Sequence, residues 1–210
     1  MPNLTVQFNI RQDIGGIPGP VISGGNFATG DTFFTEILMG DIDPNAVGLV
    51  SSAVDINFNA NNIKNIDNPF NPGDINSPLV TAQFPIGRTG TLDNNNGSIV
   101  NLGGGAFPPF IGSPLGINQL ETFSLMHFQT IAAGNSNLTL NIDLTQTGFV
   151  GGILADPNTL SQFIQPISVF QTDPIQTVPE PMTVFGIITA AVFSFFRRFK
   201  NEMHHWGGLP

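Results

Sequence analysis

Alternation of apolar and polar side chains is the feature that most constrains the fold of this chain. It is clearest in Leu4–Ile10, Val50–Phe58 and Leu138–Leu144, where apolar residues recur mostly at every second position. Successive side chains of a β-strand point to opposite faces of its sheet, so this period predicts strands with one face on a core.

Further strands are predicted between these segments. Asp31–Met39 is rich in phenylalanine, and Val80–Ile86 alternates again. The dipeptide Asn96-Gly97 separates two short apolar runs, Thr91-Leu92 and Ser98–Val100, which is a strong hairpin signal.

The segment Phe123–Phe128 is apolar in both phases of the alternation. Phe123, Leu125 and His127 would share one face, with Met126 and Phe128 on the other. A strand of this kind is expected at the centre of a sheet, covered on both faces.

Composition supports an all-β domain. The chain has 24 Gly, 17 Pro and 22 Asn in 210 residues, which favours turns over helices. At least seven strands and no convincing helix before Pro179 predict an antiparallel β-sandwich over residues 1–171, with a barrel as the lesser alternative. Gly15–Gly25, rich in glycine and proline, is predicted to be a loop.

Charge and cysteine content exclude several classes of protein. Before residue 179 the only basic residues are Arg11, Lys64 and Arg88, against 13 Asp and Glu, a balance of −10. A surface this acidic does not attract phosphate backbones, so no nucleic-acid partner is expected. The chain has no cysteine, which removes disulfides, thiolate nucleophiles and cysteine metal sites.

The C-terminal region has a different pattern. Residues 172–181 form a proline-spaced, extended linker, and residues 182–196 carry no charge. A helix of that length spans about 22 Å against a hydrocarbon core of about 30 Å, so residues 182–196 are predicted to cross a membrane with the help of snorkelling flanks. Arg197, Arg198 and Lys200 form a basic stop that places residues 197–210 in the cytoplasm. A buried core helix is the alternative.

Val178, Pro179, Glu180 and Pro181, followed by Thr183, Gly186, the apolar run and the basic pair, resemble the PEP-CTERM sorting signal of exported Gram-negative and cyanobacterial proteins. The resemblance implies recognition of Pro-Glu-Pro by an exosortase, a membrane-embedded cysteine transpeptidase, and removal of the tail. The chain departs from the family in continuing past the basic cluster to Pro210.

The resemblance implies export, yet Met1–Gly30 has no apolar run of the kind a signal peptide needs. We therefore expect Met1 to be a misassigned start or the sequence to be a fragment. The expected localisation is an inner-membrane-anchored precursor and then the cell surface or the medium.

The order of segments also resembles the cohesin and carbohydrate-binding sandwich families. Gly30–Phe33 is similar to their Gly-Asp strand start, and Ser52–Asn59 with Ile63 and Ile66 is similar to a core strand and following turn. Phe123–Phe128, then Ala133–Ser136 and Leu138–Leu140, is similar to their late strand, Ala-Gly turn and final core strand. The resemblance covers residues 30–147 and implies the sandwich fold rather than an activity.

Calcium and phosphate sites are not predicted. Asp41–Asn45 opens like an EF-hand loop, but Ala46 stands at the glycine position and Ser52 at the bidentate glutamate position. Gly103-Gly104-Gly105 has no following Lys and opens no helix, so it is predicted to begin a surface loop, Gly103–Leu115. Phe107 and Phe110 in that loop would pack across the sandwich end or, less favoured, stack on a sugar.

No catalytic residue is predicted. His127 is the only histidine before the tail, and no serine is singled out as its nucleophile. Glu36 and Glu121 could form a glycosidase pair only at a fixed separation, which sequence does not give. His204-His205-Trp206 could bind a metal only adventitiously.

These observations predict a non-enzymatic, exported structural protein of the cell surface or extracellular matrix, without cofactor or metal. The alternative is a carbohydrate-binding or cohesin-type protein-binding module. Its partners, beyond the exosortase and the membrane, would be a polysaccharide or a surface protein. Exposed coplanar aromatics in a groove would favour sugar, and a flat apolar sheet face would favour a protein partner. A smooth polar surface with neither feature would leave the structural matrix role.

Overall fold

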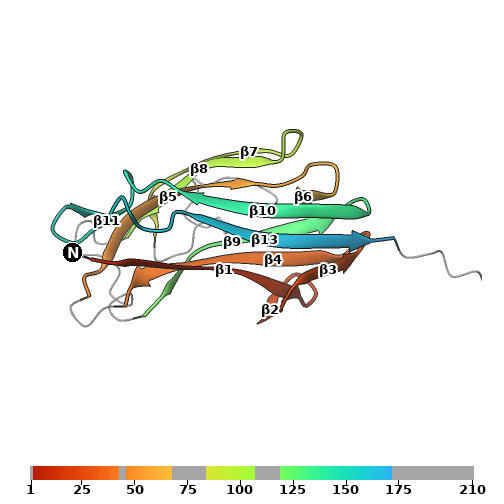
Figure 1. Cartoon of the computed structure of the whole chain (residues 1–210), viewed down its shortest axis with the longest axis horizontal. Helices are drawn as coiled ribbons and strands as arrows, with labels where there is room; N and C mark the ends of the chain where they lie inside the picture. Colours follow the sequence, from red (N-terminus) through yellow and green to blue (C-terminus); the bar gives the residue numbers. More distant parts are fainter. Residues whose placement is uncertain (1, 43–45, 68–83, 107–118, 172–210) are drawn as a thin grey trace, which may run out of the picture. The chain divides into compact units, whose positions relative to one another are not determined.

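The computed structural model describes residues 2–42, 46–67, 84–106 and 119–171. The chain divides into two units, residues 1–172 and 173–210, and all described residues belong to the first. Those residues form two β-sheets (Figure 1). The described ranges contain no helix. They therefore contain no helix that is long and apolar enough to cross a membrane.

Sheet A has five strands, and each pairs antiparallel with its neighbours. In spatial order they are β2 (Pro18–Val21), β1 (Leu4–Asp13), β4 (Thr32–Asp41), β9 (Glu121–Thr130) and β6 (Ile63–Asn65). The central strand β4 pairs with β1 along nearly its whole length, from Gln12↔Phe33 to Leu4↔Asp41. β4 and β9 therefore lie inside the sheet.

Sheet B has eight strands and is built around β5. One side of β5 pairs with β8, which pairs with β7, and the other side pairs with β10 and β11. β10 continues the sheet to β13 and β3, and β11 to β12. The bounds are β3 Gly25–Ala28, β5 Leu49–Asn57, β7 Ile86–Asp93, β8 Ser98–Gly105, β10 Gly134–Ile142, β11 Gly148–Phe149, β12 Ile153–Leu154 and β13 Gln162–Phe170.

One hydrophobic core lies between the sheets. Its fully buried side chains come from both, including Phe33 and Phe128 of sheet A and Ile56 and Leu138 of sheet B. The rings of Phe33 and Phe128 stack at a centroid distance of 5.8 Å. Burial of a side chain of this size contributes about 1.5–3 kcal/mol, and this core compensates for the absence of disulfides.

The sandwich prediction is confirmed, and so are the strands with the clearest alternation. Leu4, Phe8 and Ile10 of β1 are buried, as are Leu138 and Leu140 of β10. The Asn-Gly hairpin is the β7–β8 turn. Gly97 there has φ +67°, and a Cβ would lie 2.0 Å from the Phe58 carbonyl oxygen, so only glycine fits.

The predicted division of faces in β9 is wrong at Phe123. The register between β4 and β9 shifts between Ile37 and Leu38, where an extra residue on β9 forms a bulge. The bulge brings Phe123 to the same inner face as Met126 and Phe128. β9 lies inside sheet A, between β4 and β6, as expected, but Leu125 and His127 on its outer face are only half-buried.

The prediction of a purely antiparallel sandwich is also corrected, because β13 and β3 pair in parallel. The predicted Gly15–Gly25 loop contains β2 and ends at the start of β3. Pro166 obscures β13 in the sequence, since proline is rare inside sheets. It precedes Ile167, the first residue of β13 that pairs with β3, so its missing N–H interrupts no bond to that strand.

Gly103–Gly105 is not a loop but the end of β8, paired with Ser51–Ala53 of β5. The rest of the predicted loop, including Phe107 and Phe110, lies outside the described residues. The predicted strand Val80–Ile86 also lies largely outside them, although Phe84 is buried and Ile86 begins β7.

Candidate binding surfaces

The outer face of sheet B is formed by alternate residues of β5, β8, β10 and β13. Thr139 of β10 lies opposite Asn57 on one side and Ile164 on the other, while its neighbours Leu138 and Leu140 point into the core. We call this surface the amide face. Its members are Asp55, Asn57, Val100, Asn101, Asn137, Thr139, Asn141, Gln162, Ile164 and Pro166.

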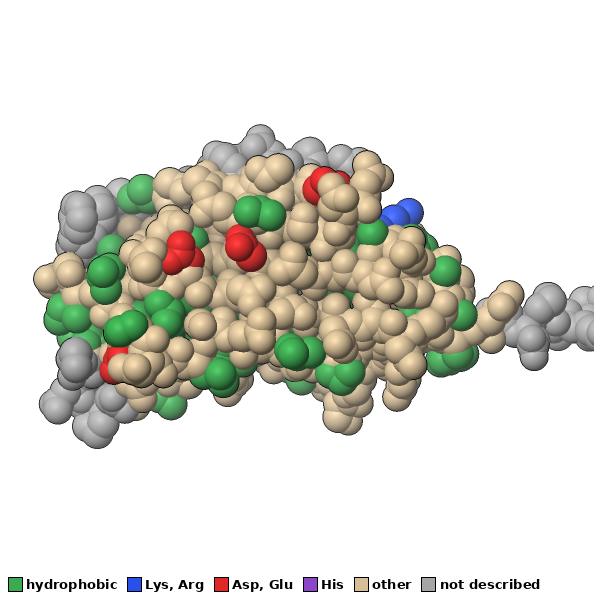
Figure 2. Space-filling view, turned by 45° about the horizontal axis from the view of Figure 1, so that its top comes forward, with side chains coloured by type: hydrophobic (Ala, Val, Ile, Leu, Met, Phe, Trp, Pro, Cys, Tyr) green, Lys and Arg blue, Asp and Glu red, His purple; other side chains and the backbone are tan. Residues whose placement is uncertain are grey.

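Neutral hydrogen-bonding groups dominate the amide face. Gln162 Nε2 donates to Asn141 Oδ1 at 2.8 Å, while Asn57 and Asn137 are exposed and free of such partners in the described structure. Aliphatic side chains interrupt the amides, with Val100 47% and Ile164 54% exposed. Figure 2, which turns the β5–β8 side forward, shows a surface made mostly of neutral polar side chains and backbone, with scattered hydrophobic patches and a few acidic groups.

A bulge shapes one part of the amide face. Val100 and Asn101 of β8 together lie opposite Asp55 of β5, and Asn101 has φ 53°. The backbone N–H of Asn101 donates to Asp55 Oδ1 at 2.6 Å, which holds the bulge in place. Both bulge side chains are therefore exposed.

A shallow trough of about 370 Å³ lies beside the bulge, over β7, β8 and β5. Gly103 and Gly105 form its floor, and Ser51, Thr89 and Gln146 line its rim. A Cβ at Gly103 would lie 2.8 Å from Thr89 Oγ1, so the glycine keeps the floor low. The Gly103–Gly105 motif, predicted to begin a surface loop, thus lines a trough on the surface of sheet B.

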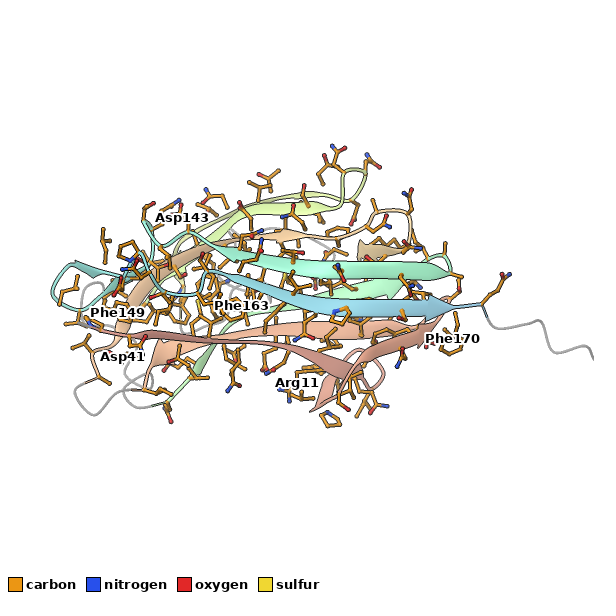
Figure 3. All side chains as sticks on the ribbon, in the orientation of Figure 1. Arg11, Asp41, Asp143, Phe149, Phe163 and Phe170 are labelled. Atoms are coloured by element: carbon orange, nitrogen blue, oxygen red, sulfur yellow. The ribbon has the colours of Figure 1, made fainter. Side chains whose placement is uncertain are left out.

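The outer face of sheet A is different. Arg11 Nη1 of β1 donates to Glu36 Oε2 of β4 at 2.7 Å, and Arg11 Nε donates to the Gly19 carbonyl at 2.8 Å. Figure 3 shows Arg11 on β1, at the bottom of the view and away from β10 and β13. Thr122 Oγ1 donates to the other oxygen of Glu36 at 3.3 Å.

His127 lies on the same face, as the register of β4 and β9 requires. Its ring stacks on Phe34 at 4.1 Å, and its Nε2 lies 2.8 Å from Asp13 Oδ2. Its backbone N–H donates to Asp67 Oδ2 at 2.9 Å. The prediction of a half-buried structural histidine agrees with this packing.

The two aspartates beside His127 have opposite pKa shifts. Desolvation raises the pKa of Asp13, but hydrogen bonds from Thr32, the Gly16 N–H and His127 outweigh it and lower the pKa overall. Desolvation raises the pKa of Asp67 despite its hydrogen bonds from His127 and Asn65. Asp13 is therefore an ionised partner for His127.

The other predicted site residues do not assemble into a catalytic or metal site. Glu36 is committed to Arg11, and Glu121 lies opposite Met39 at the far end of β9. Asp41, which opens the EF-hand-like segment, is buried and accepts the Val47 N–H at 3.2 Å. The described residues contain no group of three His, Asp or Glu placed to hold a metal.

The sorting residues Val178, Pro179, Glu180 and Pro181 lie outside the described residues, and so do Arg197, Arg198 and Lys200. The linker, the predicted membrane helix and the basic tail lie there as well. These assignments therefore stay predictions.

Several solved structures resemble this chain. A cohesin module from a Clostridium perfringens family 33 glycoside hydrolase has a TM-score of 0.48 and 13% identity, covering 81% of this chain and 98% of the module. The sixth cohesin of Acetivibrio cellulolyticus scaffoldin B, solved with a Cel5 dockerin, has a TM-score of 0.46 and 12% identity, with coverages of 79% and 99%. A type II cohesin from that organism has a TM-score of 0.47 and 9% identity, with coverages of 79% and 95%.

No protein-family profile and no curated protein sequence matches the chain. The structural likenesses have TM-scores below 0.5, so partner and ligand must be argued from this chain's own surfaces.

Proposed function

We propose that residues 1–171 form a non-enzymatic module that binds a protein partner on the amide face. The observation that carries the proposal is the mixture on that face of exposed amides and exposed aliphatics, exemplified by Asn137 opposite Pro166 and by Ile164 two residues before Pro166 on β13. Amides donate and accept hydrogen bonds and so match the polar groups of a polypeptide, while aliphatic side chains gain by desolvation.

A polysaccharide partner has less support on this face. Sugar rings stack on exposed aromatic side chains, and Phe170, at the end of β13, is the one large aromatic that is substantially exposed in the described ranges. The chain has no tyrosine. Of the two binding alternatives raised by the sequence, carbohydrate and protein, the proposal therefore takes protein. Cohesins among the similar structures were solved with dockerins, but the proposal does not depend on them.

Absence of catalysis is part of the proposal. In the described structure the His127 imidazole bonds to Asp13 and stacks on Phe34, an arrangement that orients the ring but presents no nucleophile to it. Glu36 is neutralised by Arg11. Both groups have roles in holding sheet A together.

Export and sorting remain proposed from the tail sequence. Two prolines flank Glu180, and prolines favour the extended backbone that a peptidase site binds. Replacing Pro179 and Pro181 with alanine in the native host should block processing, so that the full-length membrane-bound form accumulates. Unaltered processing of this variant would reject the exosortase assignment.

The binding proposal is tested by site-specific photo-crosslinking in the native host. A photoreactive residue at Thr139 should crosslink to a defined protein, whereas one at Gln7, exposed on the outer face of sheet A, should not. The captured protein is then purified and titrated by calorimetry. Thr139→Arg should weaken its binding at least tenfold, about 1.4 kcal/mol, and Gln7→Arg should leave it unchanged.

Equal crosslinking from Thr139 and Gln7, or equal binding by the two arginine variants, would reject the amide face as the docking surface. Absence of any specific protein would favour the structural matrix role, the other function that the sequence predicts.

A further inference from the structure

A second recess lies at the end of sheet A where β1, β3 and the start of β4 meet. Its volume is about 620 Å³, within the range of small-molecule pockets of about 300–1,000 Å³. The polar and glycine residues that line it are Gln12, Asp13, Asn26, Gly30, Asp31 and Thr32. None of them belongs to the amide face.

The walls of this pocket are held in place by the protein itself. The Asp13 carboxylate accepts hydrogen bonds from Thr32 Oγ1 at 2.5 Å, the Gly16 N–H at 2.6 Å and His127 Nε2 at 2.8 Å. The opposite wall follows β3, whose Gly25 packs so closely on β13 that a Cβ would lie 2.7 Å from the Pro166 carbonyl oxygen. The Asp13 wall and the backbone of β3 are fixed in this way, whereas the exposed side chains of Gln12 and Asn26 become ordered only when a ligand binds.

Hydrogen-bonding groups in the pocket are left unused. The side-chain amides of Gln12 and Asn26 bond to no described residue, and Asp31 uses only Oδ2, which accepts the Ala28 N–H at 2.8 Å. The pocket therefore offers two groups that both donate and accept and one carboxylate oxygen that accepts.

The charge of the pocket narrows the class of ligand. Asp13 is paired with His127, so Asp31 is the one carboxylate of the lining with a free oxygen, a weak basis for holding a cation. Two carboxylates disfavour an anion. A neutral ligand with several hydroxyl groups can donate to the carboxylate and exchange hydrogen bonds with both amides.

We propose that this pocket binds a neutral polyhydroxylated ligand, a mono- or disaccharide held by Gln12, Asn26 and Asp31. Phe27 lines the pocket but is only 7% exposed, so hydrogen bonds rather than ring stacking provide recognition. We expect weak binding at this site, with a Kd on the order of 1 mM. It is separate from the protein-binding face, and its success or failure leaves that proposal untouched.

The test is an NMR titration of the full-length chain with glucose, galactose, mannose and cellobiose. The side-chain NH₂ signals of Gln12 and Asn26 and the backbone signal of Gly30 should shift in a saturable way with at least one of these sugars. Asn26→Ala and Gln12→Ala should each weaken that binding about fivefold or more. Gln7→Ala, on the same strand but outside the pocket, should bind as the wild type does.

Three outcomes would overturn the proposal. The first is absence of any shift up to about 50 mM of every sugar, far above the expected Kd. The second is binding that survives both alanine variants, which would place the sugar elsewhere. The third is saturation of the same signals by putrescine but not by the sugars, which would make the pocket a site for organic cations.

Discussion

The outer faces of the two sheets differ in how their polar side chains are paired and buried. On sheet A, Arg11 pairs with Glu36, and Asp13 pairs with His127, with all four side chains largely removed from water. On sheet B, amides and aliphatics lie exposed, and few of the amides bond to another side chain. Figure 3 shows the contrast in position, with Arg11 at the bottom of the view and Asp143 at the top beside the end of β10.

We expect this difference to separate the residues that stabilise the fold from those of the proposed binding surface. A buried charge is costly unless it is paired, so removal of one partner of a pair on sheet A should destabilise the fold. An exposed amide loses little when its hydrogen bonds are exchanged from water to a partner. Sheet A therefore contributes the structure that holds β1, β4 and β9 together, and sheet B offers the surface that can be mutated without unfolding.

Breaking the Arg11–Glu36 pair should have the largest effect. Arg11→Met leaves a largely buried carboxylate with only the Thr122 hydroxyl and should destabilise the protein by about 2 kcal/mol, below the 3–5 of a fully buried pair because Arg11 is 27% exposed. Urea denaturation measures the loss. The double variant Arg11→Met/Glu36→Leu should recover most of it. No recovery would mean that Arg11 acts through its bond to Gly19 instead.

An unpaired polar group on the inner face of β4 tests the same principle, that a buried polar group without a partner lowers stability. Thr35 is fully buried, and its Oγ1 has no hydrogen-bond partner in the described structure. Because a buried hydroxyl without a partner costs about 1–3 kcal/mol, Thr35→Val should stabilise the protein by about 1 kcal/mol. Thermal and urea unfolding measure the gain. A loss of stability would show that the hydroxyl, not the methyl group, is what this position needs.

Sequence predicted the strands better than the surfaces they form. β1, β5 and β10 were recognisable because period-two alternation is a local property of the chain. The bulge places Phe123 on the inner face, and the pairing of β13 with β3 begins only after Pro166. Both features depend on the neighbouring strands, which no local sequence pattern describes. Gly103–Gly105 looks like a loop for the same reason, since its strand character comes from β5 and β7.

The pairs on sheet A were beyond reach of sequence alone. Asp13 and His127 are 114 residues apart, and only the registers of β1 with β4 and of β4 with β9 bring them together. His127 was expected to be a core or half-buried histidine, and it is half-buried, but its partner could not be named. The amide face was equally hidden, because it requires knowing that β10 lies between β5 and β13.

The Asp13–His127 pair gives the next smaller effect, one that depends on pH. The pKa of Asp13 lies below its ordinary value of 3.8, so its contribution to stability is complete above that value and is lost as the pH falls through the folded pKa. Asp13→Asn should therefore lower the melting temperature at pH 6, and its difference from the wild type should shrink below about pH 4. A constant difference from pH 6 to pH 2.5 would assign the loss to geometry rather than charge.

The smallest effect on stability should come from the amide face. Thr139→Arg places a long side chain among exposed neighbours, Asn57 and Ile164, where no buried group loses a partner. The free energy of unfolding should change by less than about 0.5 kcal/mol, the usual size for a surface substitution. The same variant is expected to weaken partner binding at least tenfold.

His127→Ala, which removes a ring stacked on Phe34 and a bond to Asp13, should cost more stability and leave partner binding intact. If instead Thr139→Arg unfolds the protein and His127→Ala prevents binding, the roles assigned to the two faces are reversed.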